Sequence, residues 1–343
     1  MPSEQDRKLP DEAPTIPAVD LQEFLQGSPA QQQRIASEVD NVCRTIGFLI
    51  VENHGIPADV VDHAWEACRA FFDLPIDEKL RCRSDDPACP RGYFPMAAEA
   101  LAKSLGVETP PDIKESIGIG PSHQPAGTID PEDYDFHFGE NFWPRRPEAF
   151  RPAVSNYFAA MEQLGSRVLR LFAAALDLPH EYFQQYHTYP RSALRCINYP
   201  ATSARPADGQ RGAGEHSDYG SITLLKSDPN IPGLEIKLAS GGWVSAPLVQ
   251  DAFIVNIGDL MARWTNDRWV STLHRVTNPV SESGEVTRRQ SMAFFHNTDF
   301  DARIVCIPTC LAPGEIARYE PVLAGKYLMQ RFTSAVNALN VAD

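Results

Sequence analysis

The chain of 343 residues has little of what marks membrane, secreted or nucleic-acid-binding proteins. It contains no run of 18 apolar residues, so we expect no transmembrane helix. The first residues, Met1 to Asp6, lack the apolar segment of a secretory signal. Basic residues number 31 against 45 acidic ones, and the net charge of −14 argues against nucleic acid or an anionic membrane as a partner. A cytoplasmic protein with a small-molecule partner is the expectation that remains. The sequence does not indicate an oligomeric state.

Cysteine is also sparse. The seven cysteines are scattered, and none forms a Cys-x-x-Cys pair. An odd, dispersed set is typical of free thiols in a reducing compartment. Cys306 and Cys310 are near each other in sequence, but that spacing alone is a weak indication of a disulfide. The hydrophobic content of 43% is enough to bury a sizeable core.

The first half of the chain predicts mixed helix and strand. Residues 1–14 are polar and predict a disordered tail. Apolar spacing and turn residues predict the following elements: strands at 16–21 and 47–55, helices at 28–44 and 57–72, a short helix at 97–105, and a long helix at 147–176 that ends before Pro179. Residues 81–150 otherwise predict an irregular connection.

The second half predicts a sheet-rich core. Short strands separated by turn residues are expected at 194–200, 221–225, 234–238, 243–245, 252–257, 270–276 and 290–296. Repeated short strands of this kind indicate a sandwich or barrel. Residues 313–340 return to a helical pattern. The fold class expected is mixed α and β, with a double-stranded β-helix, a jelly-roll variant, flanked by helices and preceded by an N-terminal α/β region.

Three residues in this core suit a metal ion. His216 and Asp218 form a His-x-Asp motif, whose side chains share one face if the segment is extended. His274 supplies a second imidazole. Two imidazoles and one carboxylate form the facial triad of non-haem Fe(II) oxygenases, which leaves metal positions open for other ligands. Zinc is a rival, but its hydrolytic use needs a general base, and strand alternation turns the obvious candidate, Glu215, away.

A second motif follows the triad. Arg289 and Ser291 share one strand face and offer a guanidinium fork and a hydroxyl, which suit a carboxylate. Arg288 is one position away and is expected to face outward. His54 follows an apolar strand, and we interpret it as a structural histidine outside the metal site.

These residues resemble a known family. The stretch 213–225, which includes Glu215 to Gly220, and the later stretch 257–260 are similar to the isopenicillin N synthase-like 2-oxoglutarate-dependent Fe(II) dioxygenases. The resemblance runs from about Ile16 to about Phe332. Within this family, the sequence most resembles thymine hydroxylase-like and unassigned bacterial members.

The resemblance implies a jelly-roll oxidoreductase, with Fe(II) as cofactor and 2-oxoglutarate and O₂ as cosubstrates. It also implies that Tyr199, before Pro200, joins Arg289 and Ser291 in binding 2-oxoglutarate. The regions expected are a tail at 1–14, an N-terminal dioxygenase region at 15–135, packing helices at 136–190, the jelly-roll core at 191–312 and a C-terminal helical segment at 313–343. The reaction implied is hydroxylation or desaturation of a small organic molecule, with release of succinate and CO₂.

The substrate is not readable from the sequence. The candidates for its cavity wall are Tyr93, Phe94, Ile117, Trp264, Phe295 and Asn297. Two other functions stay open at this point. One is an isopenicillin N synthase-like oxidase that uses no 2-oxoglutarate, and the other is a catalytically silent jelly-roll that binds a small metabolite.

Overall fold

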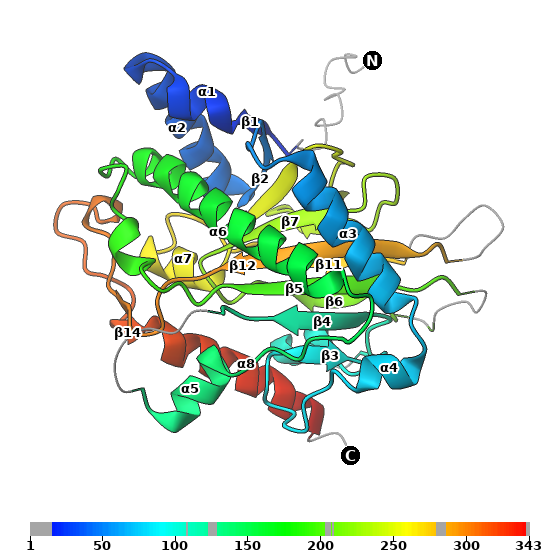
Figure 1. Cartoon of the computed structure of the whole chain (residues 1–343). Helices are drawn as coiled ribbons and strands as arrows, with labels where there is room; N and C mark the ends of the chain where they lie inside the picture. Colours follow the sequence, from blue (N-terminus) through cyan, green and yellow to red (C-terminus); the bar gives the residue numbers. More distant parts are fainter. Residues whose placement is uncertain are drawn as a thin grey trace, which may run out of the picture.

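The protein is built around one large twisted sheet, seen in the computed structural model of Figure 1. The structure describes residues 16–107, 109–122, 129–202, 207, 209–278 and 286–340; the tail predicted at 1–14 lies outside them. Eight strands form the large sheet, in the order β1 (Ala18–Asp20), β2 (Phe48–Glu52), β10 (Phe253–Ile257), β7 (Ile222–Ser227), β12 (Arg289–His296), β5 (Ala193–Tyr199), β4 (Glu115–Ile119) and β3 (Gly92–Phe94).

A smaller sheet forms the second layer. Its order is β6 (Ala213–His216), β11 (His274–Val276), β8 (Leu234–Lys237) and β9 (Trp243–Ser245). At one end the space between the sheets is filled by an apolar cluster that includes Phe48, Ile236 and Ile254. At the other end the two sheets border a cavity. The jelly-roll expected from the sequence is confirmed.

The regions that precede the core in sequence are not separate from it in space. Strands β1 to β4 extend the same sheet that holds β5, β7, β10 and β12. Each edge of the sheet therefore comes from the N-terminal region, and the central strands come from the later part of the chain.

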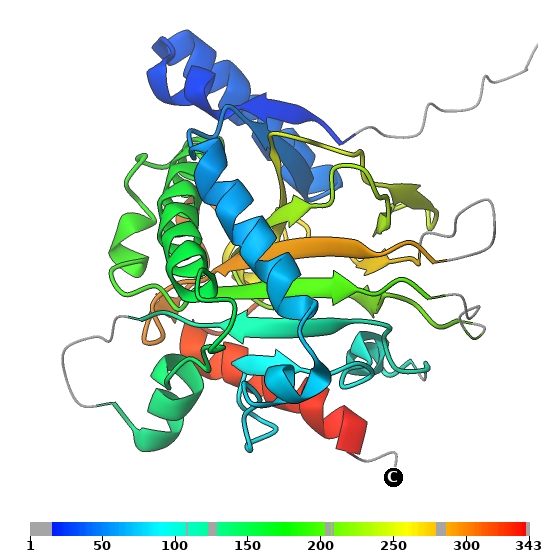
Figure 2. The ribbon, with the colours of Figure 1, turned by 45° about the vertical axis from the view of Figure 1, so that its right-hand side comes forward.

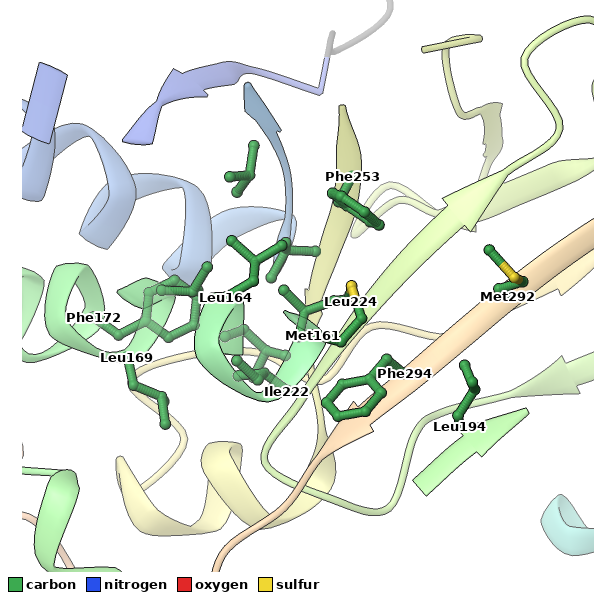
Figure 3. Close-up of a cluster of buried hydrophobic side chains, with 14 of the residues drawn as sticks. Met161, Leu164, Leu169, Phe172, Leu194, Ile222, Leu224, Phe253, Met292 and Phe294 are labelled. Atoms are coloured by element: carbon green, nitrogen blue, oxygen red, sulfur yellow. The ribbon is translucent and has the colours of Figure 1, made fainter. Parts of the chain in front are cut away.

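Helices cover the outer face of the large sheet. The long α6 (Phe150–Ala175) and α3 (Ala58–Phe72) lie across it, with α2 (Pro29–Thr45) and α1 (Leu21–Gln26) beside them (Figure 1). Ser28 and Gln31 form a capping box that begins α2. Figure 3 shows Met161 and Leu164 of α6 facing Leu224 and Phe294 of the sheet, all within one buried cluster. This apolar layer makes the large sheet a rigid support for the cavity that borders its other face.

The chain forms further helices besides these four. They are α5 (Pro131–Phe138), α7 (Asp259–Trp264), α8 (Ala324–Asn340), the short α4 (Ile76–Leu80) and the 3₁₀ turns Leu101–Leu105, Gln184–Tyr186 and Pro308–Cys310. The C-terminal helix α8 lies beside β3 and β4, away from α2 (Figures 1 and 2). A small ribbon of β13 (Arg303–Ile304) and β14 (Val322–Leu323) precedes it.

Two expectations about the elements need correction. The segment 81–150 is not simply irregular, because it supplies β3, β4 and α5. The C-terminal helix begins at Ala324 and not at 313, because the residues before it form turns and β14. Helix α7 was not predicted, because six residues are too few to show helical periodicity. All seven cysteines are free thiols, and no helix among the described residues is long and apolar enough to cross a bilayer.

Candidate functional site

The three predicted metal ligands lie close together at the adjacent ends of strands β6 and β11 in the small sheet. His216 ends β6, His274 begins β11, and the two residues are direct partners across the strands. Their ring centroids lie 4.3 Å apart. Asp218 lies just past the end of β6, and its Oδ1 is 3.7 Å from His274 Nε2. One ligand atom of each residue lies within 4.8 Å of the others, a spacing that one metal ion can fill.

Hydrogen bonds leave one atom of each of these residues free for a metal. Asp218 Oδ2 accepts from Thr223 Oγ1 at 2.6 Å and from Asn256 Nδ2 at 2.7 Å, so Oδ1 alone faces the histidines. The Nδ1 atoms of His216 and His274 lie 2.8 Å and 3.1 Å from the carbonyl oxygens of Gly214 and Thr272. A carbonyl only accepts, so each Nδ1 carries the proton and each Nε2 offers a lone pair.

The protonation states agree with this role. Burial, and then the neighbouring His274, lower the pKa of His216 to about 3, so its imidazole is neutral at pH 7. Burial opposes ionisation of Asp218, but the two histidines and the donors Asn256 and Thr223 outweigh it and lower the pKa of this carboxyl. Neutral imidazoles with a carboxylate are the forms that bind a divalent metal.

Arg289 is a buried guanidinium that lacks an anion. It is 1% exposed, and its Nη2 donates to Ser227 Oγ at 2.7 Å. Its Nε and Nη1 have no partner among the described residues. The guanidinium carbon lies 5.1 Å from the centre of the Tyr199 ring. A buried charge of this kind is costly unless a ligand supplies the counter-charge, so these atoms fit an incoming carboxylate.

One cavity of about 660 Å³ joins both groups. Its wall includes the three ligands, Arg289, Ser291 and Tyr199, and among the predicted substrate residues Tyr93, Phe94, Phe295 and Asn297. The side chains of Arg289, Ser291, Ala293 and Phe295 follow one another along β12 on this wall, as strand alternation predicts. A small organic molecule fits a cavity of this volume.

Two of the predicted wall residues lie elsewhere. Ile117 is fully buried in the apolar cluster under the helices, because its neighbour Gly118 takes the cavity side of β4. Trp264 ends α7 and packs against Phe183 and Tyr186 at 5.1 Å and 4.8 Å between ring centroids. Both predictions are corrected: these side chains belong to the core.

The polar groups of two other wall residues are already engaged. Tyr93 Oη donates to Glu115 Oε2 at 2.5 Å. Asn297 Nδ2 donates to the carbonyl oxygen of Arg191 at 3.2 Å, and its Oδ1 accepts from Ser221 N. Phe94 and Phe295 are therefore the predicted residues with the most freedom to contact a substrate.

The sequence reasoning missed a charged cluster on the wall. Arg195 Nη1 lies 2.5 Å from Glu99 Oε1, and Lys114 Nζ lies 3.1 Å from Glu99 Oε2 and 3.5 Å from Asp112 Oδ2. Burial opposes ionisation of Glu99, but Arg195 and Lys114 outweigh it and lower its pKa to about 2. Two cations and two carboxylates balance one another. Arg195 shares a β5 face with Tyr199, and this alternation was the only signal that could have found it.

The residues set aside by the sequence analysis lie outside the site. Glu215 pairs with Arg275 at 3.2 Å, so it is not placed as the base of a zinc hydrolase. Arg288 points away from the cavity, but it pairs with Asp73 and Asn198 and is not a free surface charge. His54 Nδ1 accepts from the backbone N–H of Ile56.

Comparisons with known proteins place the chain in a family. The family described as "non-haem dioxygenase in morphine synthesis N-terminal" matches residues 16–146, and the 2OG-Fe(II) oxygenase superfamily matches residues 186–298. The homoarginine-6-hydroxylase 2-ODD-233 of Oryza sativa is 31% identical over 87% of this chain and 88% of its own length. The validamycin A dioxygenase of Streptomyces hygroscopicus is 29% identical over 92% and 86%.

Solved structures agree. Full-length Neurospora crassa thymine 7-hydroxylase in complex with alpha-KG and thymine superposes with a TM-score of 0.81 at 31% identity, over 93% of this chain and 96% of that one. JOX2 in complex with 2OG, Fe and JA gives a TM-score of 0.75 at 27% identity, over 95% and 89%. The ligand triad and the unpaired arginine have the chemistry that such complexes require. The chain belongs to the 2OG-Fe(II) oxygenase superfamily and is a 2-oxoglutarate-dependent dioxygenase that acts on small molecules.

Proposed function

We propose that this protein hydroxylates, or desaturates, a small organic molecule held in the 660 Å³ cavity. His216, Asp218 and His274 hold Fe(II), and Arg289, Ser291 and Tyr199 bind 2-oxoglutarate. The observation that carries the proposal is the buried Arg289, whose Nε and Nη1 have no partner in the described chain, on the same cavity wall as the three ligands. Because Arg289 and the three ligands line one cavity, a molecule held there can meet both groups.

The bound iron, with 2-oxoglutarate and O₂, supplies the oxidation of a substrate C–H bond coupled to decarboxylation to succinate and CO₂. This chain's residues position the reactants. The guanidinium of Arg289 takes the distal carboxylate through two hydrogen bonds, and Ser291 can add a third. Thr223 and Asn256 both donate to Oδ2 of Asp218, so Oδ1 is the oxygen that would be offered to the metal.

The rest of the cavity has room for the substrate. Phe295 lies two pleats beyond Ser291, roughly 13 Å along the strand, and lines the same cavity. Phe94 lies on the cavity wall, and the guanidinium carbon of Arg195 lies 4.2 Å from the centre of its ring. Aromatic faces with a charge-balanced polar edge suit a compact molecule that carries both apolar and hydrogen-bonding parts.

The names of similar proteins do not settle the substrate. Homoarginine, validamycin A and thymine appear in three of these names, and they differ in charge, size and shape. Relatives of similar identity therefore act on unrelated molecules, and the scaffold alone does not specify one.

Succinate release tests the proposed sites. The protein, freed of metal and reloaded with Fe(II), should release succinate only when 2-oxoglutarate and O₂ are both present. Asp218→Ala should abolish this release and weaken iron binding, while Glu215→Ala, next to a ligand but turned outward, should retain both. Full succinate release by Asp218→Ala would contradict the ligand assignment.

A further inference from the structure

The carboxylate of Asp259, at the start of α7, connects the segments that carry all three ligands. Its Oδ2 accepts from Ser217 Oγ at 3.2 Å, and Ser217 lies between His216 and Asp218. Its Oδ1 accepts from Ser271 Oγ at 2.7 Å. Ser271 lies in the segment that leads into β11 and His274. One half-buried carboxylate therefore fixes the distance between the two ligand-bearing segments.

The backbone at the start of α7 holds the same turn. Asp259 N donates to the carbonyl oxygen of Asp218 at 2.7 Å, Leu260 N to Gly220 at 3.1 Å, and Gly258 N to Ser221 at 3.0 Å. A Cβ on Gly258 would lie 2.2 Å from the carbonyl oxygen of Gly220, so no larger residue fits here. Asp259 is therefore in a fixed position relative to the metal ligands, and any group that moves its carboxylate acts on them.

The C-terminal helix supplies such a group. Arg331 of α8 donates through Nη2 to Asp259 Oδ2 at 2.7 Å. Its guanidinium carbon also lies 4.7 Å from the centre of the Tyr219 ring, next to Asp218 in sequence. Leu328 and Phe332, three residues before and one after Arg331, line the cavity. The helix face that closes the cavity wall is thus the face that carries the arginine.

We propose that Arg331 is a positioning residue, which makes the ligand geometry of the metal site depend on the seating of α8 against the cavity. The proposal rests on the ligand assignment given above. The contacts described for Arg331 are to Asp259 and Tyr219, and none among the described residues is to a ligand side chain or a proposed cosubstrate residue, so it acts through these two. When α8 is seated, the guanidinium orders the Asp259 carboxylate, and the carboxylate orders the turn from His216 to Gly220. When the arginine is removed, the helix and the metal site lose this connection.

Binding of Mn(II) to the metal-free full-length protein tests the proposal without turnover. Free Mn(II) is measured by its electron paramagnetic resonance signal, and the unfolding temperature of each metal-free variant is measured in parallel. Arg331→Ala should raise the Mn(II) dissociation constant about three- to tenfold, because it acts through Asp259 and tenfold is the smallest loss typical of a group bonded directly to a ligand. Arg331→Lys should recover most of the affinity, because an ammonium can still reach Asp259 but cannot lie flat on Tyr219.

Arg263→Ala is the matched control. Arg263 donates to the carbonyl oxygen of Glu320 at 2.6 Å and stacks on Tyr319, so it holds the segment before α8 without touching Asp259. Its removal should leave the Mn(II) affinity within about twofold of the starting protein, below the loss expected for Arg331→Ala. Equal losses in Arg263→Ala and Arg331→Ala would overturn the proposal, since general docking of the C-terminal segment would then explain both.

Asp218→Ala separates this proposal from the one it rests on. If Asp218→Ala binds Mn(II) as tightly as the starting protein, the ligand assignment fails. If Asp218→Ala loses Mn(II) while Arg331→Ala keeps full affinity, only the role of Arg331 fails. A second readout is the amount of succinate released per bound Fe(II) in the absence of substrate. Arg331→Ala should change this ratio, and Arg263→Ala should not.

Discussion

The two faces of strand β12 differ in what they hold. On the face toward α6, Met292 and Phe294 are fully buried, and the Phe294 ring lies 5.0 Å from the Phe158 ring. On the face toward the cavity, Arg289 and Ser291 offer polar atoms, followed by Phe295. Neighbouring strands repeat the division, with Leu224 against Thr223 in β7 and Val255 against Asn256 in β10.

This difference indicates how the fold separates stability from chemistry. Side chains that pack the core and side chains that line the cavity alternate along the same strands, one residue apart. A substitution on one face should therefore change unfolding, and a substitution on the next residue should change binding or turnover. The variants below test how completely the two faces are separated.

The largest effect is expected on the core face. Phe294→Ala removes a fully buried ring and leaves a cavity beside α6, which costs about 3–5 kcal/mol of the free energy of unfolding. Urea denaturation measures this loss. The fraction that stays folded should bind 2-oxoglutarate normally, because this ring is not among the side chains of the cavity wall. A weakened affinity in folded Phe294→Ala would show that the two faces are coupled.

The next effect is on cosubstrate binding. Arg289→Ala removes the buried guanidinium proposed to bind the 2-oxoglutarate carboxylate, and losing such a desolvated contact costs about 2–5 kcal/mol. The 2-oxoglutarate concentration needed for half-maximal succinate release should rise accordingly. Arg288→Ala is the matched control, because this neighbour lies on the opposite face and pairs with Asp73. An unchanged requirement in Arg289→Ala would mean that another cation binds the carboxylate.

A smaller effect is expected at Thr223. Thr223→Val keeps the shape of the side chain but removes the donor to Asp218 Oδ2, which leaves Asn256 as the remaining donor to that oxygen among the described hydrogen bonds. The affinity for Mn(II) should fall about tenfold. Thr265→Val removes a buried hydroxyl that bonds Met261 in α7 and should leave the affinity unchanged. If Thr223→Val binds Mn(II) normally, the hydrogen bond is not needed to orient the carboxylate.

The smallest effect is expected at Phe295. Stacking of its ring on a planar or unsaturated substrate is worth about 0.5–1.5 kcal/mol beyond area burial. Phe295→Ala should uncouple the reaction, so that each succinate released is accompanied by less oxidised product. The ratio of product to succinate measures this directly once a substrate is found. If the ratio holds while stability falls, Phe295 belongs to the core and the two faces are less distinct than proposed.

The parts of the site that could be predicted are those whose geometry follows from short sequence motifs. His-x-Asp and Arg-x-Ser carry their geometry within three residues, and alternation places Arg289 and Phe295 on one wall. Strand β4 could not be assigned in this way, because all five of its residues are buried and the pattern does not say which face Ile117 takes. The Glu99–Arg195 and Arg331–Asp259 pairs could not be predicted either, since their members lie 96 and 72 residues apart in sequence.

The sheet order has a consequence for how the chain is made. Strand β2 is complete at Glu52, but β10, its antiparallel partner, appears only at Phe253. At a synthesis rate on the order of 5–20 residues per second, β2 waits roughly 10–40 s for that neighbour. During this interval β1 pairs with one edge of β2 and helices α1 and α2 contact it, but the edge that β10 will occupy stays open. Such distant pairing slows folding, so the ribosome-bound chain is most exposed to aggregation along this edge before Phe253 emerges.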